Sequence, residues 1–195
     1  MPHLHKALTL AVIVQQIQTF ETNNLTMDNK IFFSEQQRFK QIWLWLILLV
    51  VNGLFIFGLT KQVIFGHQFG DKSISNIGLI IVTILTLLLS FLFLNLRLET
   101  KIKADGIYVR FFPFHLTFKY YPWDKLNQSF VRQYNPIGEF GGWGLRGFGK
   151  NRALNVSGDK GIQLVTQNGS KILIGTNKAE EATEILNQLG HFTTT

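Results

Sequence analysis

The stretch IGLIIVTILTLLLSFLFLNL, residues 77–96, decides the class of this protein. None of its side chains is charged. A helix of about 20 apolar residues, at 1.5 Å per residue, crosses the ~30 Å hydrocarbon core of a bilayer. A helix in the core of a soluble protein needs a polar stripe, and this run has none. The stretch therefore predicts a membrane-spanning helix.

A second uncharged run, WLWLILLVVNGLFIFGL, occupies residues 43–59. It is slightly short for a span, but residues 63–65 extend it if Lys61 snorkels toward the headgroups. The short connection between the two runs predicts an antiparallel helical hairpin. Residues 34–37, SEQQ, match the S-x-x-Q capping box, so we expect the first helix to begin near Ser34 and the hairpin to occupy residues 34–96.

The distribution of lysine and arginine predicts the orientation of the hairpin. The loop between the spans has two cations, whereas the flanks of the spans have more, and the positive-inside rule places cation-rich flanks in the cytoplasm. The sequence thus predicts a multi-pass protein of the inner (plasma) membrane with both termini cytoplasmic. The loop cations are Lys61 and Lys72, and the flanking ones are Lys30, Arg38, Lys40, Arg97, Lys101, Lys103 and Arg110.

Two polar residues, Asn52 and Thr86, lie near the centres of the spans. An antiparallel hairpin brings these depths together, and an interhelical hydrogen bond in a membrane contributes roughly 0.6 to 2 kcal/mol. The alternative is an ion or substrate path, but no ionisable group supports it. We therefore expect Asn52 and Thr86 to serve helix packing.

The N-terminal residues 1–33 form a leader whose role stays open. They contain a short apolar run, but no small-residue cleavage site of the signal-peptide kind follows it. Either Met27 is the true start, or the leader is a loosely ordered surface segment. His3 and His5 are spaced H-x-H, which at a terminus indicates a mobile end rather than a metal site.

From residue 97 to 195 the pattern changes to period two with frequent turns, which is typical of antiparallel strands. Asn168-Gly169 joins two apolar runs and is a strong hairpin signal. Residues 177–190 predict a closing helix, with Asn177 as N-cap and Glu180 at N3. We expect an α+β membrane protein, in which a transmembrane hairpin precedes a small β-barrel or sandwich that the helix plugs with Ile185 and Leu189.

Four short motifs in this region carry a resemblance: GGWGLR at 141–146, NVSG at 155–158, GIQL at 161–164 and ILIGT at 172–176. With the two spans before them, they resemble uncharacterised bacterial two-span membrane proteins with a cytoplasmic pleckstrin-homology-like (PH-like) domain. The resemblance covers roughly residues 34–189. It implies a fold and a membrane topology, and it brings no established activity, so no catalytic residue is carried over.

The stretch GGWGLRGFGK, residues 141–150, imitates three nucleotide- or RNA-binding motifs. A dinucleotide loop needs a helix after the glycines, and no helical period follows Gly147. A Walker A loop needs Ser or Thr where Asn151 stands, and an RNP1 strand needs aromatic residues beyond the glycines. We predict no nucleotide and no nucleic acid as partner, and interpret the stretch as a long strand connection whose glycines adopt positive φ.

The cations of this loop are the best candidate site. Beside Trp143, the side chains of Arg146, Lys150 and Arg152 are expected to contact anionic lipid headgroups, or else to form an ordinary solvated basic face. There is no cysteine, nothing places His115 beside Ser157, and no acid pair indicates a metal. We expect no enzyme activity, no catalytic residue, no metal and no cofactor.

The sequence favours a non-enzymatic, membrane-tethered PH-like binding module that presents a cytoplasmic surface to a protein, a peptide or anionic lipid. The alternative is an accessory subunit of a larger membrane complex, with the hairpin as the interaction element. Membrane lipid is the expected partner in both cases, and a protein partner or self-association stays open.

Overall fold

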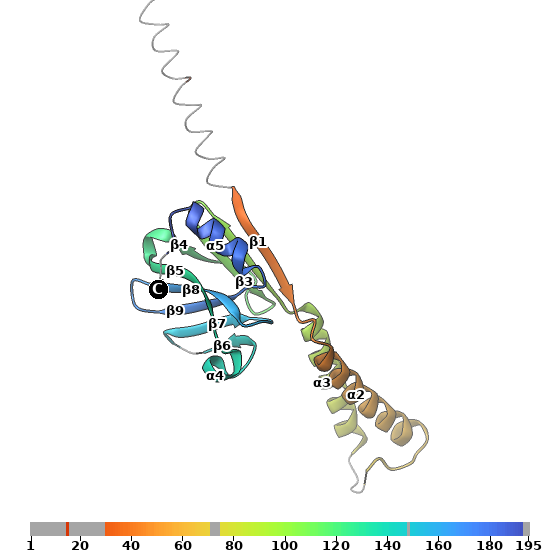
Figure 1. Ribbon diagram of the computed structural model, residues 1–195. Coiled ribbons are helices and arrows are strands. Elements are labelled where there is room, and N and C mark those ends of the chain that lie inside the picture. Colours follow the sequence, from red (N-terminus) through yellow and green to blue (C-terminus); the bar gives the residue numbers. More distant parts are fainter. Residues whose placement is uncertain (1–14, 16–29, 71–74, 148, 193–195) are drawn as a thin grey trace, which may run out of the picture.

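The computed structural model describes residues 15, 30–70, 75–147 and 149–192. It is an α+β structure in which two sheets and a C-terminal helix form one body, and a helical hairpin projects from one end of it (Figure 1). The expectations for His3, His5, Met27 and Lys72 fall outside the described residues.

The hairpin consists of α2 (Ile42–Leu59) and α3 (Asn76–Asn95), with a π-helical turn, η1 (Thr60–Ile64), continuing α2. The predicted extension beyond Lys61 is therefore confirmed as far as Ile64. Both helices are long and apolar enough to cross a membrane, and only 11% of each apolar window is buried inside the protein. A core helix of a soluble protein is mostly buried, so these two are not of that kind.

The segment before the hairpin corrects one prediction. Residues 34–37 do not cap a helix; they belong to strand β1 (Ile31–Arg38), and α2 begins at Ile42. The reason is period-two burial: Phe33, Glu35 and Gln37 are buried while their neighbours are exposed. β1 pairs with the strand that follows the hairpin, so tertiary pairing overrides the local capping pattern.

The first sheet has the order β1-β2-β3-β4, with β2 (Arg97–Lys103), β3 (Gly106–Phe112) and β4 (Lys119–Pro122). All its pairs are antiparallel. Because Arg38 pairs with Arg97, the helical hairpin is an insertion between two neighbouring strands of one sheet. The chain leaves the sheet along β1 and re-enters it along β2 (Figure 1).

The second sheet has the order β5-β8-β9-β7-β6. Its strands are β5 (Leu126–Gln133), β6 (Gly144–Arg146), β7 (Asn151–Asn155), β8 (Lys160–Thr166) and β9 (Lys171–Gly175). The predicted hairpin at Asn168-Gly169 is confirmed between β8 and β9, with Gly169 at φ 77°. The pairing of β7 with β9 is parallel, which the sequence did not predict. Two further elements were not expected: η2 (Trp123–Lys125) and α4 (Pro136–Phe140).

One hydrophobic core joins the two sheets and the C-terminal helix α5 (Ala179–Gln188). Ala182 and Leu186 are fully buried, and Ile185 and Leu189 pack partly buried against the same core, so the packing of the predicted helix is confirmed. Its predicted cap is wrong, because the N-cap is Lys178. No strand pairing links the two sheets within the described residues, so a closed barrel is not shown. The two sheets on their shared core are called the sandwich.

Candidate functional site

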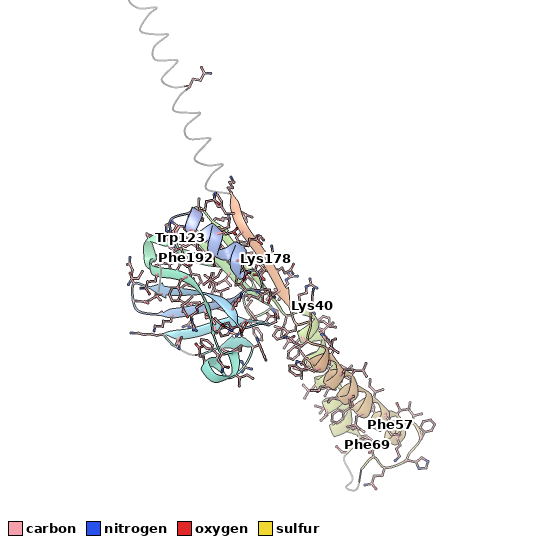
Figure 2. The ribbon with its side chains drawn as sticks, in the orientation of Figure 1. Lys40, Phe57, Phe69, Trp123, Lys178 and Phe192 are labelled. Carbon is pink, nitrogen blue, oxygen red and sulfur yellow. The ribbon has the colours of Figure 1, made fainter. Side chains whose placement is uncertain are left out.

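The junction between the hairpin and the sandwich is held by several side chains. Gln41, the residue before α2, donates from Nε2 to the carbonyl oxygen of Val156 at 2.7 Å. Trp45 Nε1 donates to the carbonyl of Phe39 at 3.0 Å, and the Phe39 ring meets Phe93 edge-on at 5.5 Å. Figure 2 shows Lys40 at this junction. These contacts make the connection a packed joint rather than a flexible tether.

Strand β1 is also fastened to the second sheet. The buried carboxylate of Glu35 accepts hydrogen bonds from the Thr176 hydroxyl at 2.6 Å and from the Asn177 backbone N–H at 2.9 Å. Gln37 Nε2 donates to the carbonyl of Gly175 at 2.7 Å. The strand that leads into the hairpin therefore holds the end of β9 and the link to α5.

Two of the four candidate site residues lie together on the hairpin side of the second sheet. Trp143 Nε1 donates to the carbonyl of Gly158 at 3.0 Å, and Gly158 is two residues beyond Val156, the acceptor of Gln41. Arg146 Nε donates to the carbonyl of Trp143 at 2.9 Å. This places the indole and the guanidinium near the junction.

The other two candidates lie at the end of β7 away from Val156: Lys150 comes directly before the strand and Arg152 is its second residue. Arg152 shares a face of β7 with Leu154, which belongs to the core between the sheets, whereas Arg146 pairs with Ala153 on the opposite face. The four side chains therefore do not converge on one site. Their contact with lipid stays a prediction.

The glycines of residues 141–150 behave as expected. Gly141, Gly142, Gly144, Gly147 and Gly149 have φ between 64° and 120°. At Gly147 a Cβ would also collide with the backbone oxygen of Asn151. The chain continues from these glycines into a strand, β7, so no helix N-terminus is formed there to face a phosphate.

Within the hairpin, the predicted polar contact has a different partner. Asn52 Nδ2 donates to the Ser90 hydroxyl at 2.7 Å and to the carbonyl of Leu48 at 2.6 Å. Thr86 donates within its own helix to Thr83, and its carbonyl accepts from the Ser90 hydroxyl at 3.0 Å. Ser90 lies one turn beyond Thr86, and the sequence reasoning missed it.

A second feature that the sequence reasoning missed is the loop of residues 113–118, between β3 and β4. The pairs Arg97–Phe112 and Val109–Lys119 place this loop at the end of the first sheet from which the hairpin leaves. Phe114 is 57% exposed and Leu116 is 74% exposed. The apolar run FPFHLTF, residues 112–118, could have indicated this loop from the sequence, because so apolar a turn is unusual in water.

The shape of this loop is set by hydrogen bonds to its stem. The His115 N–H donates to the carbonyl of Phe111 at 2.8 Å, and Arg110 Nη1 donates to the carbonyl of Leu116 at 3.4 Å. The Phe118 ring is covered by Arg110 at 4.5 Å and by Lys101 at 4.8 Å. Phe118 is thereby held against the sheet, while Phe114 and Leu116 project outward.

Electrostatics around the loop are positive. Partial burial, and then the charge of Lys119, lower the pKa of His115 below its ordinary value of 6.5. Burial, and then the charge of Arg152, lower the pKa of Lys119. Lys119 and Arg152 thus add positive charge near the loop, whereas Arg97 and Arg110 are paired with Glu99 at 2.8 and 2.5 Å.

Three further observations on the described residues concern possible chemistry. A pocket of about 290 Å³ lies at the lower limit of the usual range for ligand sites, and its lining is Tyr120, Tyr121, Pro122, Lys125, Leu126, Thr166, Gln167 and Asn168. The Ser157 hydroxyl bonds to Asn177, not to His115. Among the described residues no group of His, Asp and Glu is placed to hold a metal ion. Comparison of the chain with family models, curated proteins and solved structures finds no match.

Proposed function

We propose that the hairpin crosses the inner membrane and holds the two-sheet domain against the cytoplasmic leaflet, where the domain acts as a non-enzymatic binding module. The observation that carries this proposal is the insertion of two apolar helices between the paired strands β1 and β2. A hairpin attached in this way leaves and returns on one side, so the whole domain lies on that side.

The exposed surface of the helices supports a lipid environment. Large apolar side chains cover nearly every side of both helices, among them Leu49 at 70% and Ile77 at 72% exposure. Leaving one such side chain in water costs about 1.5–3 kcal/mol relative to burial. Summed over the hairpin, this cost favours a bilayer strongly over an aqueous surrounding.

The proposed orientation depends on charge. Arg38, Lys40 and Arg97 stand at the domain end of the hairpin, whereas Lys61 is the cation described near the tip. The positive-inside rule then directs the domain to the cytoplasm. The sandwich with a core-packed C-terminal helix supports the PH-like assignment as a proposal of architecture.

The proposed binding role depends on the packed junction between the hairpin and the domain. The contacts of Gln41 with Val156 and of Phe39 with Phe93 hold the domain in a set orientation to the helices, so one face always points away from the bilayer. Confinement to a membrane raises the effective concentration of the domain for partners at the same surface. A protein, a peptide or an anionic lipid headgroup at that surface is the expected ligand.

Labelling of single cysteines tests this function, because the chain has no natural cysteine. His67→Cys places a thiol in the loop at the hairpin tip, and Lys171→Cys places one on an exposed position of the domain. A membrane-impermeant maleimide applied to spheroplasts should label the thiol at position 67 and spare the thiol at position 171 until the cells are lysed. Labelling of both sites in intact cells, or recovery of the chain in the aqueous fraction after an alkaline wash, contradicts the proposal.

A second function is favoured by one observation. At Gly53 on α2 an added Cβ would meet nothing within 4 Å, so this exposed helix face has room for another helix. The protein would then be an accessory subunit of a membrane complex. If Gly53→Ile abolishes co-purification of a stoichiometric partner in mild detergent while Lys171→Ala does not, the hairpin is the interaction element.

A further inference from the structure

We propose that the loop of residues 113–118 is a membrane-interface anchor, with Phe114 and Leu116 inserted among the lipid headgroups beside the hairpin. This inference rests on the proposed function, since it requires the hairpin to lie in a bilayer. With this loop inserted, the domain has a second point of contact with the lipid surface besides the hairpin.

The position of the loop follows from strand register. Arg97 is the first residue of β2 and comes directly after Leu96, the C-cap of α3. Its partner across the sheet is Phe112, the last residue of β3. Paired strands lie about 4.8 Å apart, so β3 ends at the depth where α3 ends. The loop after β3 therefore lies at the level of the membrane interface.

The loop exposes apolar side chains whose removal from water would be favourable. Phe114 and Leu116 are 57% and 74% exposed, whereas the neighbouring Phe118 lies against Lys101 and Arg110 on the outer face of the first sheet. Phe114 keeps one ring contact, with Phe111 at 6.1 Å between centroids. Trp and Tyr are enriched at the headgroup level, and Trp43, in the first turn of α2, is exposed at that level. Phe and Leu are among the side chains that surface segments insert at the boundary of the headgroups and the acyl chains.

The charges around the loop fit an anionic lipid surface. Arg38, Lys40 and Lys119 are exposed near this end of the first sheet. Cations near an anionic membrane surface strengthen the attraction to it. An apolar tip with flanking cations is the pattern by which a surface segment binds a membrane interface.

Helix α4 exposes another apolar side chain at the same end of the domain. Figure 1 places α4 at the end of the sandwich from which the hairpin leaves, and Ile137 of α4 is 68% exposed. Two contact points besides the hairpin set the tilt of the domain on the membrane. The bilayer is therefore a nearer apolar phase for this loop than a soluble protein partner.

The test uses the full chain reconstituted in vesicles of phosphatidylcholine and phosphatidylglycerol, with the fluorophore NBD on a single cysteine. Leu116→Cys reports the loop, Leu49→Cys reports the hairpin, and Asp124→Cys is the control. Asp124 follows Trp123, which Figure 2 shows at the end of the sandwich away from the hairpin. Nitroxide-bearing lipids should quench NBD at 116 and 49 and leave NBD at 124 unaffected.

A second experiment removes one apolar side chain of the loop without adding charge. Phe114→Ser should shift the probe at 116 toward water, on the order of tenfold in the ratio of inserted to free loop. Thr117→Ser, its matched control in the same loop, should leave that ratio unchanged. The probe at 49 should be quenched equally in both variants.

The outcomes separate the two proposals. Quenching at 49 without quenching at 116 overturns the loop anchor and leaves the membrane-spanning hairpin standing. Absence of quenching at both positions overturns the loop anchor together with the proposed function. Equal quenching at 116 in the wild-type and Phe114→Ser backgrounds also overturns the anchor, because insertion would then not depend on the apolar side chain.

Discussion

Near the middle of the hairpin, Asn52 links the two helices through the Ser90 hydroxyl at 2.7 Å. From the sequence, the contact is predicted at the correct depth but with Thr86 as the partner, because depth alone does not fix the rotation of a helix. Ser90 lies four residues from Thr86 and bonds to its carbonyl, so the two share a face.

Asn52→Leu should destabilise the hairpin by roughly 0.6 to 2 kcal/mol, because it removes this interhelical bond. The measurement is unfolding in mixed micelles with increasing denaturing detergent. Asn95→Leu is the matched control, since Asn95 Nδ2 donates to the carbonyl of Phe91 within its own helix. Equal midpoints for the two variants would show that the bond contributes nothing to packing.

Gly147 shows what the glycine-rich stretch requires at the level of one residue. Its φ is 77°, and a Cβ there would also strike the backbone oxygen of Asn151. Gly149 has φ 64° with nothing within 4 Å of the added atom. The two positions therefore separate backbone strain from steric collision.

Gly149→Ala should cost roughly 1–2 kcal/mol, the penalty of left-handed backbone for an L-residue. Gly147→Ala should cost more, because Asn151 belongs to a paired strand and its backbone must move. Thermal unfolding of the detergent-solubilised protein measures both. If Gly147→Ala is the milder change, close approach is not the reason for that glycine.

At the scale of elements, β1 is the most informative. Its inward residues Glu35 and Gln37 are polar, so period-two hydrophobicity is absent and the SEQQ stretch resembles a capping box. Their hydrogen bonds go to Gly175, Thr176 and Asn177, about 140 positions away in the chain. A single-sequence pattern contains no sign of partners so distant.

The β3–β4 loop makes stability depend on pH. His115 has a pKa below 6.5 in the folded protein because burial, and then Lys119, disfavour its charged form. The unfolded chain therefore binds the proton more readily, so this contribution to stability is present above about pH 6.5 and is lost as pH falls through the folded pKa.

His115→Gln should lose less thermal stability than the wild type between pH 7.5 and 5. The reason is that glutamine does not titrate, whereas protonation of His115 is less favourable in the folded protein than in the unfolded chain. Glutamine can still accept from the Phe111 N–H that now donates to His115 Nδ1. Melting temperatures of both proteins at the two pH values make the comparison. An identical loss in both proteins would show that His115 does not contribute.

For the whole molecule, the insertion of the hairpin between β1 and β2 means that the domain is discontinuous in sequence. The boundary drawn from sequence at residue 97 leaves β1 outside the domain. The structure puts β1 in register beside β2, with Phe33 1% exposed in the shared core. Removing residues 1–96 would take a strand from the sheet.

Replacing residues 42–95 by Asn-Gly should give a folded domain that stays in solution, because β1 and β2 are adjacent and antiparallel and the six residues left between Arg38 and Arg97 are enough to close a hairpin. The fragment 97–195 should be markedly less stable, since it lacks Phe33 and Glu35. Circular dichroism melting curves of the two proteins compare them. Equal stability would mean that β1 is not part of the folding unit.

The sequence by itself determined those features that depend on neighbours in the chain. The apolar runs predicted both hairpin helices, Asn168-Gly169 predicted the β8–β9 turn, and residues 177–190 predicted the closing helix. The positive φ of the glycines in residues 141–150 was also foreseeable, because only a local conformation was at stake.

Only the tertiary structure decided what depends on pairing between distant segments. It assigned β1 to the sheet, joined β7 to β9 in parallel, chose Ser90 as the partner of Asn52 and put Arg146 and Arg152 on opposite faces of the second sheet. It also placed the loop of residues 113–118 at the level where the helices end. Strand register and helix rotation are set by packing against segments that are distant in the chain. A period or a motif in one sequence does not show which distant segment will be the partner.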